Sequence, residues 1–119
     1  MRLPASRRLS RHGEFARVKA KGGSHAGRFV VVNALPTGTE DPWRCAFITS
    51  KKAGGAVQRN KIRRRLREII RAQGLKIPKG RWIVTIARWR AAEASFDELK
   101  NDWIRTARRA GILPQSTAQ

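Results

Sequence analysis

The sequence has one cysteine and no long hydrophobic segment. Cys45 is alone among 119 residues, so the chain forms no internal disulfide and no cysteine-based metal cluster. Its apolar neighbours indicate a small core residue, and we expect a reducing, cytoplasmic setting. No segment approaches the roughly 18–20 apolar residues of a membrane span, so we expect no membrane partner. The basic start, residues 1–11, lacks the apolar stretch of a signal peptide and is very short for a transit peptide.

Acidic residues are also scarce. Eight Asp and Glu residues oppose 27 Lys and Arg residues, which gives a formal charge of +19 and a pI of about 12.0. Nine of the basic residues lie between Lys51 and Arg71, where Glu68 is the single acidic residue. This concentration favours a polyanionic partner, either nucleic acid or an anionic membrane surface. The length suits one domain, and the 40% of hydrophobic residues provides for a small core.

The sequence offers few groups for catalysis or metal binding. His12 and His25 lie in polar, glycine-neighboured sequence, and no pattern places a carboxylate or nucleophile beside them, so we interpret both as exposed or RNA-facing and not as catalytic. Glu40 and Asp41 are interpreted as solvated turn residues, and no acidic residue has metal-ligand spacing from a histidine. A glycine pair precedes a basic helix, but its sequence GGAVQRNK lacks the phosphate-loop pattern G-x-x-x-x-G-K-S/T. We therefore expect no catalytic residue and no metal site in the protein.

Hydrophobic periodicity predicts a single domain with the element order α-β-β-α-β-α and room for one further short strand. The expected helices are residues 11–20, 56–73 and 96–110, and the expected strands are residues 28–32, 43–49 and 81–87. Residues 21–24 and 33–42 read as loops. We expect residues 1–9 to form an extended arm, residues 10–113 the folded core and residues 114–119 a disordered tail.

The helix over residues 56–73 has the clearest pattern. One apolar stripe is formed by Ile62, Leu66, Ile69 and Ile70. The opposite side carries Asn60, Arg63, Arg64, Arg67 and Arg71, flanked by Lys61 and Arg65. Many helices have a solvated charged face, but like charges four residues apart destabilise an isolated helix. A fold that keeps this repulsion indicates a nucleic-acid partner, and arginine suits bidentate contacts to phosphate.

The last helix has the best start signal, because Ser95 and Glu98 match a capping box. Its inward stripe is predicted to contain Phe96, Leu99, Trp103, Ala107 and Ala110. Among the tryptophans, we assign Trp43, Trp82 and Trp103 to the core and Trp89 to a partly exposed loop.

Residues 50–68, SKKAGGAVQRNKIRRRLRE, resemble the signature of the protein subunit of bacterial ribonuclease P. That signature has an S-K-K loop, a small-residue turn, Ala-Val, then Arg-Asn-Arg followed by a basic helix. Glu14-Phe15 with Val18, the segment Phe29–Val32, and Ile86-Ala87-Arg88 resemble further parts of the family, so the similarity covers roughly residues 7–110. Two positions depart from the pattern: Gly55 stands where the family has Asn, and Lys61 where it has Arg.

The resemblance implies a fold and a function. The fold is an α/β (α+β) two-layer sandwich like the second domain of ribosomal protein S5, with a left-handed β-α-β crossover around the signature helix. The function is that of a protein subunit that binds the catalytic ribonuclease P RNA and the 5′ leader of precursor tRNA. The holoenzyme removes the leader with Mg²⁺ held mainly by the RNA, so the protein needs no catalytic residue of its own. We expect the free protein to be a monomer.

The resemblance also implies two RNA-contacting surfaces. Contacts to the catalytic RNA are expected from Ser50, Lys51, Lys52, Arg59, Asn60, Lys61, Arg63, Arg64, Arg67 and Arg71. A cleft for the single-stranded leader is expected from Phe15, Val18, Lys19, Val32 and Arg88. Phe15 matches a cleft aromatic, although ordinary core packing with Val18 is the alternative interpretation. Lys19 and Val32 stand where relatives often carry further aromatic residues.

Two other functions compete with this interpretation. A ribosomal-type RNA-binding protein would share the charge, but the contiguous signature helix joined to an S-K-K loop argues against it. A DNA-binding protein would also be basic, but the sequence shows no helix-turn-helix pair and no zinc-finger spacing.

Overall fold

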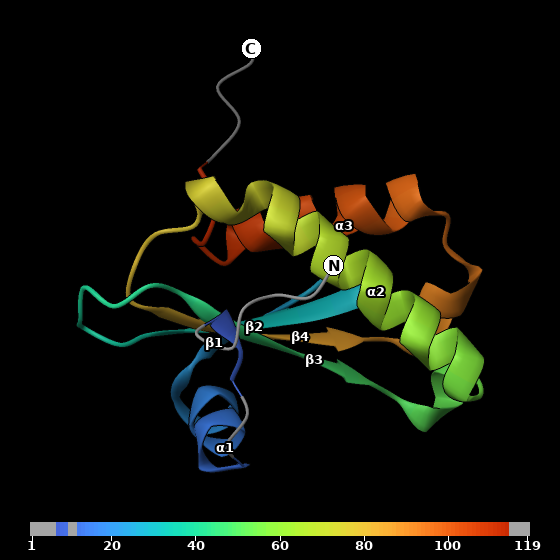
Figure 1. The fold of residues 1–119 in the computed structure, drawn as a ribbon, viewed down its shortest axis with the longest axis horizontal. Coiled ribbons are helices and arrows are strands. Elements are labelled where there is room, and N and C mark those ends of the chain that lie inside the picture. Colours follow the sequence, from blue (N-terminus) through green and yellow to red (C-terminus); the bar gives the residue numbers. More distant parts are fainter. Residues whose placement is uncertain (1–6, 10–11, 115–119) are drawn as a thin grey trace.

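The computed structural model describes residues 7–9 and 12–114, with the side chain of His12 excepted. Its helices are α1 (His12–Lys21), α2 (Ala56–Gln73) and α3 (Phe96–Arg109), and its strands are β1 (Gly23–Ala26), β2 (Val30–Pro36), β3 (Arg44–Thr49) and β4 (Arg81–Ala87). Short 3₁₀ helices η2 (Lys51–Ala53), η3 (Gly74–Lys76) and η4 (Trp89–Glu93) lie in the connections. Helices α2 and α3 cover one face of the sheet, and α1 lies on the other face (Figure 1).

The four strands form one sheet in the order β1-β2-β4-β3. Strand β2 pairs antiparallel with β1 and β4, whereas β3 and β4 are parallel neighbours. Parallel neighbours require a crossover connection, and α2 supplies it. The predicted α/β fold with a β-α-β unit is therefore confirmed, with α1 as a layer beyond the two that were expected (Figure 1). The left-handed sense of the crossover stays a prediction. Within the described residues no helix is long and apolar enough to span a membrane.

The strands around the first hairpin differ from the expected pattern. Residues 23–26 form strand β1, which is the further short strand, where a loop was expected. Strand β2 starts at Val30 and continues to Pro36, so the prediction of a loop from residue 33 was wrong for four residues. The reason is pairing across the sheet, because Asn33 and Ala34 lie opposite both β1 and β4. Pro36 is the last residue of β2, so this proline ends the strand and does not interrupt it.

The main core lies between the sheet and the α2–α3 layer. The predicted stripe of α2 is confirmed, since Ile62, Leu66, Ile69 and Ile70 are all buried. Helix α3 contributes Leu99, Trp103 and Ala107, and the indole Nε1 of Trp103 donates a hydrogen bond to Thr85 Oγ1 at 3.1 Å. The buried polar atom of that ring is thus satisfied. Phe96 and Ala110 are only partly buried at the edge of this core.

A buried carboxylate joins α3 to the start of β2. Asp102 is 1% exposed, and its two oxygens accept backbone hydrogen bonds from Arg28 (2.9 Å), Phe29 (2.8 Å) and Val30 (3.2 Å). Gly27 leaves the necessary space, because a Cβ there would lie 2.3 Å from Thr106 Oγ1. These contacts fix the chain where it enters the sheet.

A second, smaller core forms on the α1 face of the sheet. It contains Leu9, Val18, Ala46 and Val84, with Phe15, Leu35, Ile48, Trp82 and Ile86 partly buried around it. The assignment of Trp43 and Trp103 to the core is confirmed, whereas Trp82 is only partly buried and packs against this second core. Alternation along β4 places Ile83 in the main core and turns Trp82 to the α1 face. Trp89 is 49% exposed in η4, as predicted.

The two ends of the chain are described only in part. Of the predicted extended arm, residues 1–6 lie outside the described part, while Arg8 forms a parallel bridge with Cys45 and Leu9 N donates to Cys45 O at 2.8 Å. This segment therefore covers part of the outer edge of β3. Of the predicted tail, only Pro114 is described, and residues 115–119 lie outside the described part. Residue 11, the predicted first helical residue, is also outside it.

Candidate RNA interface

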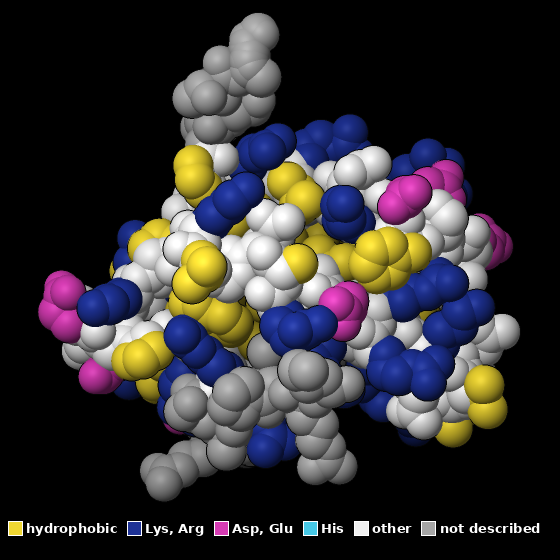
Figure 2. Space-filling model, turned by 45° about the horizontal axis from the view of Figure 1, so that its top comes forward, with side chains coloured by type: hydrophobic (Ala, Val, Ile, Leu, Met, Phe, Trp, Pro, Cys, Tyr) yellow, Lys and Arg dark blue, Asp and Glu magenta, His cyan; other side chains and the backbone are white. Residues whose placement is uncertain are grey.

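The basic side of α2 lies on the molecular surface. Figure 2 shows Lys and Arg side chains recurring over the α2–α3 side of the molecule, with few acidic side chains among them. Of the residues predicted to contact the catalytic RNA, the exposed ones are Lys51, Lys52, Asn60, Lys61, Arg64 and Arg71. The half-buried ones are Ser50, Arg59, Arg63 and Arg67. The structure thus brings all ten to η2 and to one helix, and it leaves all of them at least partly accessible.

The loop before α2 is held by its own hydrogen bonds. Ser50 Oγ accepts a hydrogen bond from the Lys52 backbone N–H at 3.1 Å and so caps η2. Gly54 follows with a φ of 124°, a conformation that L side chains rarely adopt. Gly55 is the N-cap of α2 and provides no side-chain hydrogen bond. The first turn of α2 therefore presents backbone N–H groups without a side-chain cap beside Lys51 and Lys52.

Arg63 is the most firmly oriented arginine of this surface. Its Nη1 donates to Asn60 Oδ1 at 2.8 Å, and its Nη2 donates to Thr49 Oγ1 at 3.0 Å. Asn60 is the fifth residue of α2, so it is neither the cap nor a first-turn residue. Its role in the structure is to fix the guanidinium of Arg63, which lowers the entropy lost when that group binds an anion.

The remaining arginines of α2 differ in how far they are neutralised. Arg71 Nη2 lies 2.6 Å from Glu68 Oε2, in an exposed pair that screens part of its charge. Arg65 donates to the backbone carbonyl of Ala94 at 2.9 Å and thus joins α2 to the end of η4. Arg59 has a buried Nε without a hydrogen-bond partner in the described structure. Most of the positive charge on this helix is therefore not matched by acidic side chains.

At the edge of β3, one cavity is lined by residues of both α1 and α2. Phe15 from α1 and Arg67 from α2 line one cavity of about 180 Å³, together with Arg8, Leu9 and residues 45–47. The two surfaces that were expected to bind catalytic RNA and leader are thus contiguous. Cys45 lines this cavity but is only 1% exposed. Burial raises the pKa of its thiol to about 12, against the opposing charges of Arg7 and Arg67.

The predicted leader cleft is only partly formed by the expected residues. Phe15 is half-buried, and Lys19 and Arg88 are exposed. Arg88 follows β4 and donates from Nη1 to the Gly27 carbonyl at 2.9 Å. Val18 is fully buried and holds α1 on the sheet, so as a leader contact it was predicted wrongly.

Val32 was also predicted wrongly as a cleft residue. It is fully buried in the main core, on the face of the sheet opposite α1. Side chains alternate along a strand, so its neighbour Val31, which is half-buried, shares the α1 face with Leu35. Ile48 and Ile86 are the partly buried apolar side chains of that face at the ends of β3 and β4.

Sequence reasoning missed an aromatic site around Trp82. The guanidinium of Arg17 lies 5.7 Å from the ring centroid, and that of Arg44 lies 5.9 Å from it. Arg44 is held by Glu14 Oε2 at 2.8 Å and by the Arg8 carbonyl at 2.6 Å. Two cavities, of about 250 and 350 Å³, have Arg17 and Trp82 in common. The alternation of Trp82 with Ile83 was the signal that points to this face.

Within the described part of the chain, the titratable side chains are not grouped for metal binding. Among the residues that the structure describes, no three His, Cys, Asp or Glu side chains are placed to hold a metal ion together. The donor set therefore does not fit a Mg²⁺ ion bound by the described protein residues alone. His25 is half-buried in β1 rather than exposed, and the side chain of His12 lies outside the description.

Comparison with known proteins identifies the family. Residues 3–111 match the family described as Ribonuclease P. The ribonuclease P protein component of Dehalococcoides mccartyi is 46% identical over 95 residues, which cover 80% of this chain and 77% of that protein. The protein of the same name from Acidothermus cellulolyticus is 41% identical over 104 residues, or 87% of each chain.

The fold agrees with this match. The solved structure of the ribonuclease P protein of Staphylococcus aureus superposes with a TM-score of 0.84 at 31% identity, covering 90% of this chain and 97% of that one. The fold of this chain is thus shared with that protein over nine-tenths of the chain. The chain belongs to the ribonuclease P protein component family, whose members are subunits of an endoribonuclease and function with ribonuclease P RNA.

Proposed function

We propose that this chain binds the catalytic RNA of ribonuclease P through η2 and the basic side of α2, and the 5′ leader of precursor tRNA through the surface beside α1. The observation that carries the proposal is the cavity at the β3 edge, where Phe15 of α1 and Arg67 of α2 lie together. An aromatic ring beside a cation is the combination that single-stranded RNA uses, because bases stack while phosphates meet positive charge.

The side of α2 suits a phosphate backbone. From Asn60 to Arg71 the helix rises about 16 Å, at roughly 1.5 Å per residue, which spans several phosphates of one RNA strand. Arg63 is held in position by Asn60 and Thr49, whereas Arg64 is exposed and can adjust. The fixed guanidinium of Arg63 supports a bidentate contact to one particular phosphate. The adjustable Arg64 adds electrostatic attraction to the phosphates around it.

The leader surface, in this proposal, uses Phe15, Lys19 and Arg88 around the apolar side chains of Ile48 and Ile86. Phe15 supplies a ring for stacking, and Lys19 and Arg88 supply charge for the leader backbone. Because Val18 and Val32 are buried, they act only by holding α1 and β2 in place. The mature tRNA body lacks the leader, so this surface distinguishes precursor from product.

The Mg²⁺ ions that the reaction requires belong, in this proposal, to the RNA. A protein of charge +19 neutralises phosphates and so lowers the bulk Mg²⁺ needed to bring RNA and substrate together. The protein itself positions substrate and contributes no acid, base or nucleophile. We place the activity in the cytoplasm, where the free thiol of Cys45 stays reduced, and we take the free protein to be a monomer.

Reconstitution tests this function. The full chain is mixed with a bacterial ribonuclease P RNA and a precursor tRNA at a Mg²⁺ concentration too low for the RNA alone. We expect cleavage at the mature 5′ end only when protein and RNA are both present. Binding of the RNA without any stimulation of cleavage would instead make the protein a general RNA-binding protein of the ribosomal type.

A further inference from the structure

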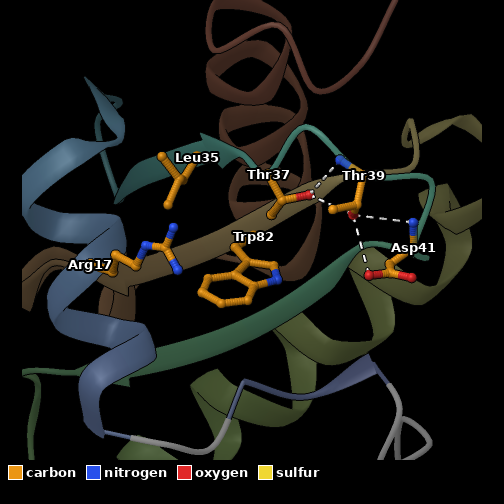
Figure 3. A pocket seen from close by; sticks show the side chains of 6 residues that line it. All are labelled: Arg17, Leu35, Thr37, Thr39, Asp41 and Trp82. Carbon is orange, nitrogen blue, oxygen red and sulfur yellow. Dashed lines mark hydrogen bonds between the residues drawn. The ribbon is translucent and has the colours of Figure 1, made fainter.

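A second cavity on the α1 face has its own chemistry. It is lined by Arg17 of α1, Leu35 of β2, Trp82 of β4 and the loop residues Thr37, Thr39 and Asp41. None of these residues lines the cavity of Phe15 and Arg67. Figure 3 shows Trp82 in the middle, with Arg17 on one side of the ring and Asp41 and the two threonines on the other.

The loop that carries Asp41 is fixed to the sheet. Gly80 N donates to the Asp41 carbonyl at 2.7 Å, and Thr37 N donates to the Gly80 carbonyl at 2.9 Å. Gly80 has a φ of 70°, and a Cβ there would lie 2.4 Å from the Thr39 carbonyl oxygen. Only glycine allows this close approach. The wall of the cavity is therefore built before any ligand arrives.

The side chains of the loop are also ordered. Thr37 Oγ1 and Thr39 Oγ1 are hydrogen-bonded at 2.9 Å, and Thr39 Oγ1 donates to Asp41 Oδ2 at 3.2 Å. The two hydroxyl groups and the Asp41 carboxylate thus form a short hydrogen-bonded chain. The carboxylate at its end lines the same cavity as the Trp82 ring. A carboxylate only accepts hydrogen bonds, so it selects a ligand edge that donates them.

The opposite rim is cationic. Arg17 is exposed, and its guanidinium lies 5.7 Å from the Trp82 ring centroid, close enough for a cation–π interaction. Arg44 approaches the same ring at 5.9 Å but is held by Glu14. Arg17 is therefore the donor group that a ligand over Trp82 would meet.

These features select a nucleobase rather than a phosphate. A phosphate would be attracted by Arg17 but repelled by Asp41, and it would make no use of the half-buried indole. Guanine offers donors, N1–H and the 2-amino group, on one edge and the acceptors O6 and N7 on another. The two cavities that share Arg17 and Trp82 measure about 250 and 350 Å³, just below and just above the lower limit of ligand-site volumes, which suits one ring system.

We propose that the Trp82 cavity binds one unpaired guanine base of RNA, stacked on the indole, with its donor edge toward Asp41 and its acceptor edge toward Arg17. This inference rests on the proposed function, because it takes RNA as the polyanion that reaches the surface. The site would be selective for one base. The other proposed contacts bind phosphates or stack on bases, and neither kind distinguishes one base from another.

Short RNA oligonucleotides test the site on the full chain. Three labelled heptauridylates are compared, with the central uridine kept or replaced by guanosine or by inosine, which lacks the 2-amino group. We expect the guanosine probe to bind about tenfold more tightly than the uridine probe, and the inosine probe to bind between them. Asp41→Asn should remove the preference of guanosine over inosine.

The matched control is Glu40→Gln, which removes the same charge from the neighbouring residue without changing a cavity residue. It should leave the guanosine preference intact. Equal effects of the two variants, or equal affinity of the wild-type chain for all three probes, would overturn the guanine site. Trp82→Leu should weaken binding of the guanosine probe, but Asp41 is exposed, so the Asp41→Asn result does not depend on whether the Trp82 variant folds.

The same protein preparation is assayed by reconstitution with ribonuclease P RNA. Stimulated cleavage without guanosine preference overturns the guanine site and leaves the proposed function in place. Guanosine preference without stimulated cleavage supports the site as an RNA-binding feature and overturns the proposed function.

Discussion

At the scale of single residues, the Asp102 carboxylate joins α3 to the start of β2. Three backbone N–H groups at the start of β2 donate to its carboxylate, and it is almost completely buried. Arg105 Nη2 lies 3.6 Å from Asp102 Oδ1, but the Arg105 side chain is largely exposed, so it stabilises the Asp102 carboxylate only a little. The hydrogen bonds from the backbone are the main compensation for burial.

Asp102→Ala should therefore destabilise the protein strongly. Removing the carboxylate leaves three buried or partly buried donors unpaired, at roughly 1–3 kcal/mol for each lost charged hydrogen bond, so we expect a loss of about 3 kcal/mol or more. Urea unfolding measures this, with Glu93→Ala at an exposed position as the control. A loss below about 1 kcal/mol would mean that water replaces the carboxylate.

Cys45 gives the stability a dependence on alkaline pH. Burial raises the pKa of its thiol from 9.0 to about 12, so the unfolded thiol ionises first as the pH rises. The stability that comes from the neutral buried thiol is fully present below pH 9 and is lost as the pH approaches 12. Cys45→Ala lacks this dependence.

We expect the unfolding free energy of the wild-type chain to fall by about 2 kcal/mol relative to Cys45→Ala between pH 8 and pH 10.5. Urea unfolding under reducing conditions at both pH values measures the difference. The same difference at both pH values would show that the thiol ionises in the folded chain as readily as in the unfolded one.

At the scale of elements, α3 shows how local sequence determines a boundary. The Ser95 side chain accepts from the Glu98 backbone N–H at 3.1 Å, and Glu98 Oε1 accepts from the Ser95 N–H at 2.9 Å, so the predicted capping box is confirmed. The backbone hydrogen bond from Ser95 is the main reason why the pKa of Glu98 is lowered.

Ser95→Ala should cost about 1 kcal/mol of stability, the usual effect of losing an N-cap side chain. Thermal or urea unfolding measures it, and Ser24→Ala, at an exposed position of β1, is the matched control. Equal stability of both variants would mean that packing of Leu99 and Trp103 alone determines where α3 begins.

Elements differed in how well they could be predicted. Helix α2 was predicted with the right bounds. Its four apolar residues form one stripe at helical spacing, and a glycine at each end marks where the helix begins and ends. Strand β1, with the sequence GSHA, has no hydrophobic pattern of its own and exists only because Val31 to Ala34 pair with it. Such long-range pairing is not visible in local sequence.

The candidate site was predicted unevenly for a related reason. The basic face of α2 follows from the spacing of its residues, and the family resemblance adds the loop before it, so the placement of both on one surface was predictable. The face of a strand residue depends on register, and a shift of one residue exchanges Val31 with Val32 and Trp82 with Ile83. Asp102 was detectable as a carboxylate next to an apolar stripe, but its partners at residues 28–30 lie more than 70 residues away in sequence.

At the scale of the whole molecule, residues of both α1 and α2 reach the edge of the sheet at β3. The β3 edge carries Phe15 from one face and Arg67 from the other, and both side chains line one cavity. The proposed function places the leader and the catalytic RNA next to each other there. This continuity predicts that changes beside α1 affect precursor more than product.

Phe15→Ala should reduce the affinity of the holoenzyme for leader-bearing precursor by about tenfold and leave mature tRNA nearly unaffected, since stacking contributes roughly 1–3 kcal/mol per base. Binding assays with both RNAs measure it, and Phe15→Leu, which keeps apolar packing, separates stacking from folding. Equal losses for precursor and mature tRNA would return Phe15 to a purely structural role.

The measurement that most directly tests α2 as the RNA-binding element is the salt dependence of binding to ribonuclease P RNA. We compare the wild-type chain with the double variant Arg63→Ala and Arg67→Ala, and with a control that removes the exposed charges of Lys76 and Arg105. We predict that the Arg63 and Arg67 variant weakens binding and lowers the slope of log affinity against log salt by about 2, near one per lost phosphate contact. The control should change the slope much less. An unchanged slope in the Arg63 and Arg67 variant would contradict the assignment of this face to RNA.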